Sequence, residues 1–145
     1  RMIGEYSGIA KATPLLAGLF LFATMSSIAL PGLNGFVGEF PILLGAYQTV
    51  RWAAVASTFG VILAAIYLLW AYQRVFHGPV TDDANRELPD LNGREVAMLA
   101  PVLALIAFIG IYPTPFLERI EPAAEKVVQQ LTQSSVLPDE GLAQP

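Results

Sequence analysis

Three stretches of this sequence are long, apolar and free of charged residues. No Asp, Glu, Lys or Arg occurs in residues 12–38, 52–73 or 96–117. About 20 apolar residues cross the hydrocarbon core of a bilayer. In lipid, backbone N–H and C=O groups must form hydrogen bonds with one another, and an α-helix forms all of them within one segment. Because 54% of the residues are hydrophobic, against roughly 45–50% in soluble domains, we expect an all-α, polytopic membrane protein.

The composition argues against several classes of function. The chain has no cysteine and one histidine, His77, so it offers neither a disulfide framework nor a thiolate metal site. His77 precedes Gly78-Pro79 and is interpreted as a solvated turn residue. We expect no cofactor or metal site within this chain. A net charge of −4 argues against nucleic acid, which is bound by clustered Lys and Arg.

Two of the apolar stretches predict continuous transmembrane helices. One covers residues 52–76, with Trp70 and Tyr72 near its end, where aromatic rings favour the boundary between water and lipid. The other covers residues 96–116 and closes with Tyr112-Pro113-Thr114-Pro115, a double proline that cannot continue a regular helix.

Residues 14–50 are too long for one straight span. They are interrupted by Pro31-Gly32-Leu33-Asn34-Gly35, which favour turns and irregular backbone. Either two short helices form a hairpin, or one discontinuous helix crosses the membrane with a break inside it. At about 1.5 Å per residue, residues 14–30 would cover ~25 Å, slightly less than the ~30 Å of hydrocarbon. Length does not decide between these interpretations.

The remaining segments are polar. We expect loops at residues 1–13 and 77–95, a surface amphipathic helix at 117–131 starting near Glu121-Pro122, and a disordered tail at 132–145. Three crossings place both loops on one side of the membrane. That side carries five of the eight Lys and Arg residues, which predicts that the loops are cytoplasmic. The polar start without an initiator Met suggests a C-terminal fragment of a longer protein.

Glu39 is the only charged residue between Lys11 and Arg51. A charge at bilayer depth costs roughly 2.5–3.5 kcal/mol on insertion scales, so such residues face a bundle interior or a water-filled path and often relay protons. Alternatively, Glu39 lies near the interface at the start of a helix, where free amides favour a carboxylate. Pro41 fits a helix that begins there. The residues alone leave both possibilities open.

Several segments match a known protein family in order along the chain: Gly8-Ile9-Ala10-Lys11-Ala12-Thr13-Pro14, Leu30-Pro31-Gly32-Leu33-Asn34-Gly35-Phe36-Val37-Gly38-Glu39-Phe40, Gln73-Arg74-Val75-Phe76, Asp90-Leu91-Asn92-Gly93-Arg94-Glu95 and Gly110-Ile111-Tyr112-Pro113. They resemble the M-type (chain 4) antiporter-like membrane subunits of respiratory complex I, the proton-pumping NADH:quinone oxidoreductase. In the related L-type and N-type subunits and in cation/proton antiporters, the position of Glu39 is typically lysine. The carboxylate therefore favours the M-type.

The resemblance implies one discontinuous transmembrane helix at 14–50 beside two continuous ones, in a fragment of a membrane helix bundle. It implies that Glu39 is the proton relay at the end of a half-channel. The implied broken-helix loop comprises Pro31, Gly32, Leu33, Asn34, Gly35 and Gly38. The subunit would be a non-redox part of a proton-pumping translocase, and the fragment alone would not be catalytic. NADH, FMN, iron–sulfur clusters and quinone would bind elsewhere in the complex.

The implied partners are the lipid bilayer and other membrane subunits of complex I, including the L-type and N-type subunits. The expected location is the bacterial inner membrane rather than an organelle membrane. Two alternatives remain. One is a subunit of a multisubunit cation/proton antiporter without a redox partner. The other is a membrane scaffold in which the broken segment only fits a neighbour, and which predicts that neutralising Glu39 leaves pumping intact.

Overall fold

The computed structural model describes residues 6–80 and 83–136, and this part of the chain contains helices and no strand. The chain divides into two compact units after Ile111. The described residues of the first unit contain four long helices and three short ones: η2 (Ile9–Lys11), α1 (Pro14–Ser27), α2 (Asn34–Thr49), α3 (Arg51–Tyr72), η3 (Gln73–His77), η4 (Asp83–Arg86) and α4 (Gly93–Ile111). The expected all-α class is confirmed.

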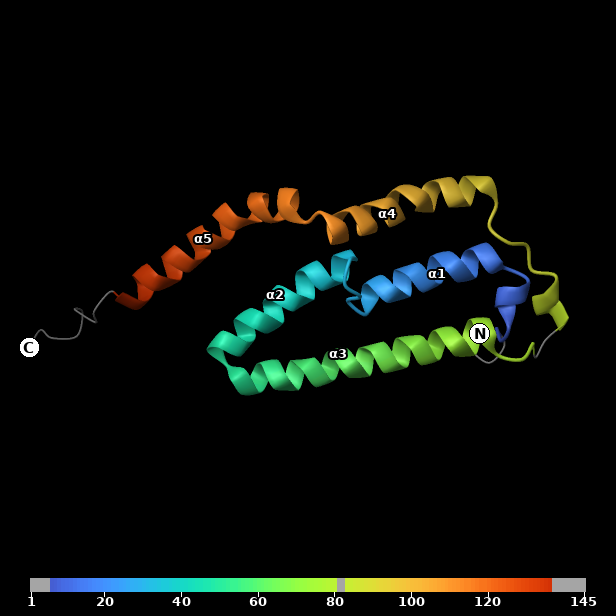
Figure 1. The fold of residues 1–145 in the computed structure, drawn as a ribbon, viewed down its shortest axis with the longest axis horizontal. Coiled ribbons are helices and arrows are strands. Elements are labelled where there is room, and N and C mark those ends of the chain that lie inside the picture. Colours follow the sequence, from blue (N-terminus) through green and yellow to red (C-terminus); the bar gives the residue numbers. More distant parts are fainter. Residues whose placement is uncertain (1–5, 81–82, 137–145) are drawn as a thin grey trace, which may run out of the picture. The chain divides into compact units, whose positions relative to one another are not determined.

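The helices of residues 14–50 form one discontinuous helix and not a hairpin. In Figure 1, α2 continues in the direction of α1 after a short break, and the chain reverses only at Val50. α3 then returns along both halves and contacts each of them, while α4 also contacts both. A hairpin would instead pair α1 with α2 side by side. The structure therefore decides the question that length left open.

The two continuous helices differ slightly from the predicted spans. α3 runs into the π-helix η3, so that the helical run Arg51–His77 contains the predicted segment 52–76. α4 begins at Gly93, earlier than predicted, and ends at Ile111 instead of 116. It ends there because Pro113 lacks an N–H and disfavours helical backbone in the preceding residue. Both runs are long and apolar enough to cross a membrane, judged by length and composition.

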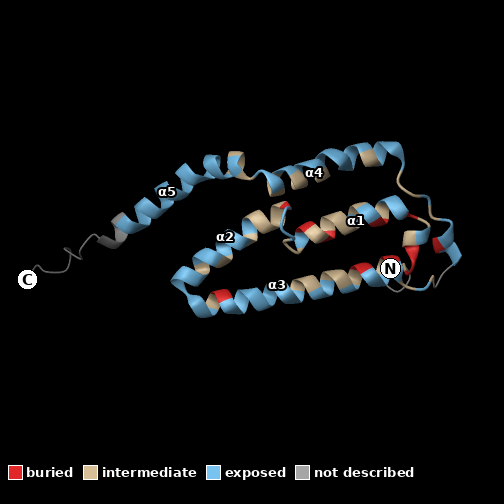
Figure 2. Cartoon of the chain, viewed as in Figure 1, coloured by how far each residue is buried: buried red, intermediate tan, exposed pale blue. Residues whose placement is uncertain are grey.

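The buried interior of the first unit is small and lies at one end. It forms where η2, the start of α1 and the end of α3 meet, and it comprises Ile9, Ala17, Tyr72 and Phe76. There the Tyr72 hydroxyl donates a hydrogen bond to the Ala17 carbonyl at 3.2 Å. Elsewhere most residues are exposed (Figure 2), including Trp52 and Ile111 at 76% each. Apolar helices with so small an interior are typical of membrane proteins.

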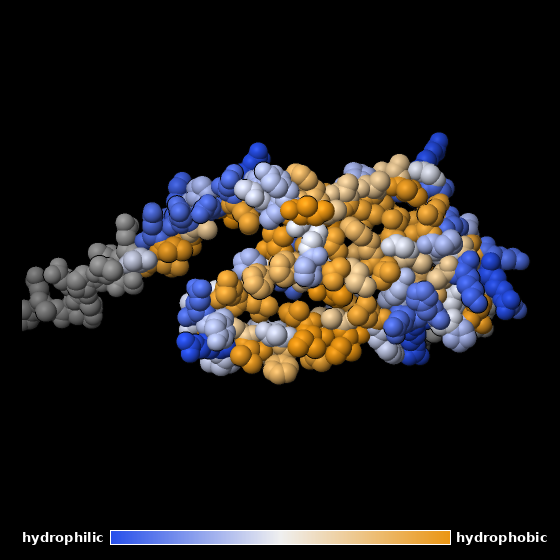
Figure 3. Space-filling model, viewed as in Figure 1, coloured by the Kyte–Doolittle hydropathy of each residue, from blue (hydrophilic) through white to orange (hydrophobic). Residues whose placement is uncertain are grey.

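The second unit contains a long amphipathic helix, α5 (Thr114–Val136). Its apolar residues recur at helical spacing, and Figure 3 shows hydrophobic and hydrophilic residues on different sides of it. These apolar residues are Leu117, Ile120, Val127, Val128 and Leu131. The helix is longer than the predicted 117–131: Pro122 lies inside it and not at its start, and it includes the first residues of the predicted tail. Residues 137–145 of that tail lie outside the described residues.

Candidate functional site

The break between α1 and α2 consists of two turns in succession. α1 ends in a Schellman motif, in which Leu30 N–H donates to the Met25 carbonyl at 3.1 Å and Ala29 N–H to the Ser26 carbonyl at 3.2 Å. Ala29 takes the left-handed conformation of this motif, with φ 56°. A turn then closes through Leu33 N–H and the Leu30 carbonyl at 3.1 Å. Several backbone N–H and C=O groups of the break are therefore hydrogen-bonded within the break itself or to the end of α1.

Pro31 and Gly32 match the second turn. Pro at the first central position and a positive φ at the second, here 92° at Gly32, are the signature of a type II turn. Leu33 is extended, with φ −118° and ψ 159°, and leads into α2.

The break is displaced from its predicted position. It covers residues 28–33, because the left-handed Ala29 ends α1 before Pro31 is reached. Three of the predicted loop residues lie within it: Pro31, Gly32 and Leu33. The other three belong to α2: Asn34, Gly35 and Gly38. The prediction was wrong for these three, because the helical context of α2 outweighs the preference of asparagine and glycine for turns.

Replacing Gly32 by alanine tests the second turn. We expect Gly32→Ala to destabilise the subunit by about 1–2 kcal/mol, because alanine is strained at positive φ. An added Cβ would meet no atom within 4 Å, so the effect is purely conformational. Gly18→Ala is the matched control, since Gly18 lies within α1 and is equally open. Thermal unfolding of the purified complex measures both; equal midpoints for the two variants would contradict the turn assignment.

Two glycines allow helices to approach the break closely. A Cβ on Gly35, in the first turn of α2, would lie 2.1 Å from the Ser26 carbonyl oxygen at the end of α1. A Cβ on Gly110 of α4 would lie 2.2 Å from the Gly32 carbonyl oxygen and 2.3 Å from Leu33 Cα. Ser26 also donates a hydrogen bond across the break to the Asn34 side chain. The break is thus held by α1, α2 and α4 together.

One side of the break remains uncovered by the described residues. Leu33 is buried, whereas Pro31 and Gly32 are exposed. Irregular backbone at membrane depth is tolerated only where protein or water covers it. The exposed side therefore requires a cover other than lipid.

Glu39 lies beyond the first turn of α2, which begins at Asn34. The structure excludes the alternative in which Glu39 occupies the start of a helix beside free amides. Pro41 lies inside α2 and does not begin it. Since proline has no N–H, the Val37 carbonyl loses its helical partner close to Glu39.

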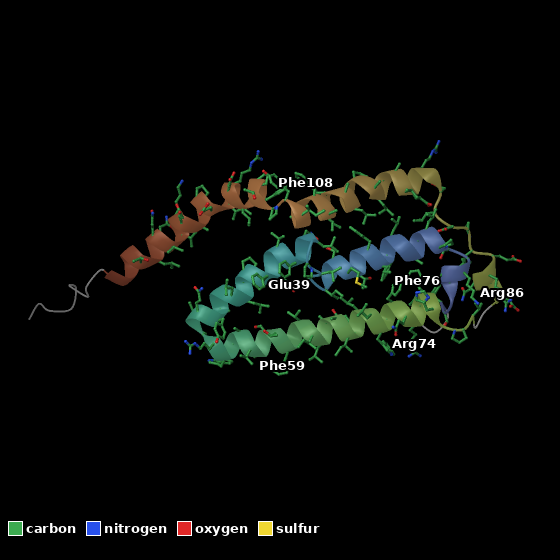
Figure 4. All side chains as sticks on the ribbon, viewed as in Figure 1. Glu39, Phe59, Arg74, Phe76, Arg86 and Phe108 are labelled. Atoms are coloured by element: carbon green, nitrogen blue, oxygen red, sulfur yellow. The ribbon has the colours of Figure 1, made fainter. Side chains whose placement is uncertain are left out.

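Glu39 borders a pocket of about 360 Å³ formed by the end of α1, the middle of α2 and α3. The other lining residues are Ser27, Ile28, Ile42, Leu43, Ser57, Gly60, Val61 and Ala64. Figure 4 labels Glu39 on α2, in the half of the broken helix that follows the break. Small residues on α3 leave room beside the carboxylate, and a site of this volume with a few polar groups can hold water.

Asp90 has a structural role that sequence reasoning missed. It lies in the loop before α4, yet its carboxylate accepts hydrogen bonds from Leu15 N–H at 2.8 Å and Leu16 N–H at 3.1 Å. These amides belong to the first turn of α1, where Thr13 provides no cap because its hydroxyl donates to the Ile9 carbonyl. Asp90 therefore caps α1 from a distant part of the chain.

The same segment also caps α4. The Asn92 side chain accepts hydrogen bonds from the Arg94 and Glu95 amides, both at 3.0 Å, and the Glu95 carboxylate accepts one from Asn92 N–H at 2.8 Å. This reciprocal pair is a capping box. Residues 90–95 thus fix the starts of two helices.

Replacing Asp90 by asparagine tests this long-range cap. Desolvation raises the pKa of Asp90, but the amides of Leu15, Leu91 and Leu16 outweigh it and hold the pKa below its ordinary value of 3.8. A lowered pKa means that the cap stabilises the fold above the unfolded-state pKa and is lost as the pH falls through the folded-state value. We expect Asp90→Asn to lower the unfolding midpoint at pH 7, and the difference from wild type to shrink below pH 3.8.

Asp83→Asn is the control for this cap, because Asp83 is 95% exposed and forms one surface ion pair with Arg86, which contributes little. Thermal unfolding measured at several pH values tests both variants. Equal effects of the two substitutions at pH 7 would show that Asp90 does not cap α1.

Comparison with known proteins supports the resemblance. Residues 1–66 match the family model described as NADH:quinone oxidoreductase/Mrp antiporter, TM. NADH-quinone oxidoreductase subunit M of Mycobacterium tuberculosis is 41% identical over 138 residues, which is 95% of this chain and 25% of that protein. Over nearly all of its length the chain is similar to proteins of this transmembrane family. It is therefore part of a membrane protein, and it spans about a quarter of the length of the relatives that it matches.

Further relatives are similar over most of the same part of the chain. Subunit M of Rhodobacter capsulatus is 40% identical over 89% of the chain, and chain 4 of Arabidopsis thaliana is 37% identical over the same share, covering 25% and 26% of those proteins. Respiratory complex I from Thermus thermophilus contains a chain with a TM-score of 0.78 and 35% identity, over 86% of this chain and 26% of that one. The M-type resemblance inferred from Glu39 agrees with these relatives.

Proposed function

We propose that this chain is a segment of a proton-translocating membrane subunit of an NADH:quinone oxidoreductase, in which Glu39 relays protons at the end of a half-channel. The observation that carries the proposal is the position of Glu39. It is a lone carboxylate inside an apolar helix, next to a helix break and a pocket large enough for water. The similarity to this family supports the assignment.

The energetic cost of the carboxylate supports a functional role. A charge at bilayer depth costs roughly 2.5–3.5 kcal/mol on insertion scales, and no ion pair among the described residues offsets this cost for Glu39. Broken helices with ionisable neighbours are a recurrent device of ion transporters, because the freed backbone groups line a cavity. A relay explains why both features occur together.

In this proposal the subunit carries no redox group itself. Electron transfer from NADH to quinone takes place elsewhere in the complex, on FMN and iron–sulfur clusters, and drives protonation changes here. The fragment alone does not catalyse the reaction. Its partners are other membrane subunits of the complex, including the L-type and N-type subunits, in a bacterial inner membrane. Such a neighbour, or the rest of the subunit, covers the exposed side of the break.

The topology proposal places residues 1–13 and 77–95 in the cytoplasm and α5 at the opposite surface, with the apolar face of α5 in the interface. The broken helix, α3 with η3, and α4 then make three crossings. The bias of Lys and Arg toward the two loops supports this orientation.

Cysteine labelling tests the topology. We expect Glu87→Cys and Gln129→Cys, each in a full-length subunit without other cysteines, to react with a membrane-impermeant thiol reagent from opposite sides. Both positions are exposed in the structure. The reagent should label Glu87→Cys in inverted vesicles and Gln129→Cys in intact cells. Labelling of both positions from the same side would contradict the proposal of three crossings.

The antiporter alternative differs in its energy source. The experiment measures proton uptake by inverted vesicles, driven either by NADH or by a cation gradient, with Glu39 as the varied residue. The proposal predicts uptake that requires NADH oxidation and depends on Glu39. A cation/proton antiporter would instead show uptake with a cation gradient alone. The assignment to an oxidoreductase would be overturned if cation-driven proton uptake depended on Glu39 and no NADH-driven proton uptake were observed.

A further inference from the structure

A pocket lined by two cations lies at the loop end of the first unit. Lys11 is the last residue of η2 and Arg86 the last of η4. Together with Gly8, Ala12 and Val80 they surround a space of about 280 Å³. No acidic side chain lines it among the residues that the structure describes. The pocket is therefore lined by two cationic side chains.

Both cations are available to a ligand. Within residues 6–80 and 83–136, Lys11 has no ion-pair partner. Arg86 pairs with Asp83 through Nε at 3.1 Å, but the two side chains are 67% and 95% exposed, and such exposed pairs are weak. The guanidinium keeps further N–H donors for another acceptor.

Close backbone packing holds the pocket open. Gly8 has a left-handed φ of 74°, and a Cβ on it would lie 2.5 Å from the Gly78 carbonyl oxygen and 2.9 Å from Val80 Cγ2. Ser7 donates a hydrogen bond to the Arg74 carbonyl at 3.3 Å beside this contact. The two chain segments that border the pocket are thus fixed against each other.

The pocket lies at the loop end of the first unit, which the proposed topology places at the membrane surface. The end of α3 next to it carries the exposed Trp70, and such aromatic rings favour the interface. The guanidinium of Arg74 lies 5.0 Å from the centre of the Trp70 ring. Figure 4 shows Arg74 and Arg86 at this same end, and Figure 3 shows hydrophilic residues gathered there beyond the hydrophobic helices.

We propose that Lys11 and Arg86 bind the phosphate of an anionic phospholipid headgroup. Lys and Arg form charge-assisted hydrogen bonds with phosphate oxygens, and basic pockets near helix ends on the cytoplasmic side bind anionic headgroups. The bilayer surface supplies this phosphate at the depth of the pocket. The inference rests on the proposed topology only in placing this end at the cytoplasmic surface, and it is independent of the role of Glu39.

The test titrates the purified complex, containing the full-length subunit, with dioctanoylphosphatidylglycerol and counts bound lipid by native mass spectrometry. We expect Lys11→Gln and Arg86→Gln each to weaken binding about fivefold, and the double variant about 25-fold, from ~1 kcal/mol per cation near an anionic surface. Arg94→Gln is the matched control, because Arg94 is exposed in the same region outside the pocket, and it should bind like wild type. Dioctanoylphosphatidylcholine should bind more weakly than phosphatidylglycerol.

Two outcomes would overturn the proposal. One is unchanged phosphatidylglycerol binding by the double variant. The other is displacement of the lipid by inorganic phosphate at similar concentrations, which would identify a free anion as the ligand. If the double variant does not assemble, the single variants decide, together with Lys11→Arg, which keeps the charge and should keep the affinity. NADH-driven proton uptake, measured in parallel, should remain at the wild-type level in all these variants.

Discussion

Glu39→Gln should abolish most proton transfer through this subunit while the complex still assembles. Glutamine keeps the shape and hydrogen-bonding capacity of the side chain but carries no titratable proton. A positioned proton-transfer group contributes about a hundredfold or more to the rate of its step, so we expect transfer through this path to fall at least tenfold. Glu39→Asp keeps the proton and shortens the reach, and it should retain more activity than Glu39→Gln.

The measurement is NADH-driven proton uptake by inverted vesicles, together with quinone reduction and the amount of assembled complex. Glu87→Gln makes the same substitution in the exposed loop and should pump like wild type. If Glu39 were only a structural residue, glutamine would be tolerated at least as well as aspartate, because it avoids burying a charge. A Glu39→Gln complex that assembles and pumps at the wild-type ratio of protons to electrons would remove Glu39 from the path.

Gly110→Ala should reduce both the stability of the subunit and its pumping. An added Cβ would lie 2.2 Å from the Gly32 carbonyl oxygen and 2.3 Å from Leu33 Cα, and neither backbone atom can rotate away. Overpacking of this kind costs about 1–3 kcal/mol. The gain in helix propensity, about 1 kcal/mol for alanine over glycine, offsets only part of it. The displaced break should also impair transfer past Glu39.

Gly45→Ala is the control for this contact. Gly45 lies inside α2, and a Cβ there would meet no atom within 4 Å, so this variant should be neutral or slightly stabilised. Thermal unfolding and proton uptake per assembled complex measure both variants. Two variants with the same unfolding midpoint would show that α4 does not press against the break.

The sequence predicted the features that depend on local composition. Charge-free stretches indicate α3 and α4 because a helix of about 20 apolar residues carries its own signal. The break was expected because proline and glycine mark turns, and Pro31-Gly32 does form one. Glu39 stood out because no other charged residue lies near it in the sequence. The choice between a hairpin and a discontinuous helix required the resemblance, and the structure then decided it.

The features that sequence reasoning missed depend on contacts between distant residues. The cap of α1 by Asp90 joins residues 75 positions apart, which no local pattern reveals. The start of the break at residue 28 depends on Ala29, an alanine in a conformation that glycine usually adopts. Pro41 and Pro122 suggested helix starts, yet both lie inside helices. Such positions reflect packing that outweighs local preference.

Contacts with the broken helix lie near both ends of α4. At its start, Asp90 holds the first turn of α1, and near its end Gly110 fits against Gly32 and Leu33. α4 therefore acts as a strut of fixed length alongside α1 and the break. Sliding of α1 along its axis would cost either the hydrogen bonds at one end or the glycine contact at the other. A change in the width of the pocket beside Glu39 therefore involves α2 or α3, which line it together with the end of α1, rather than a sliding of α1.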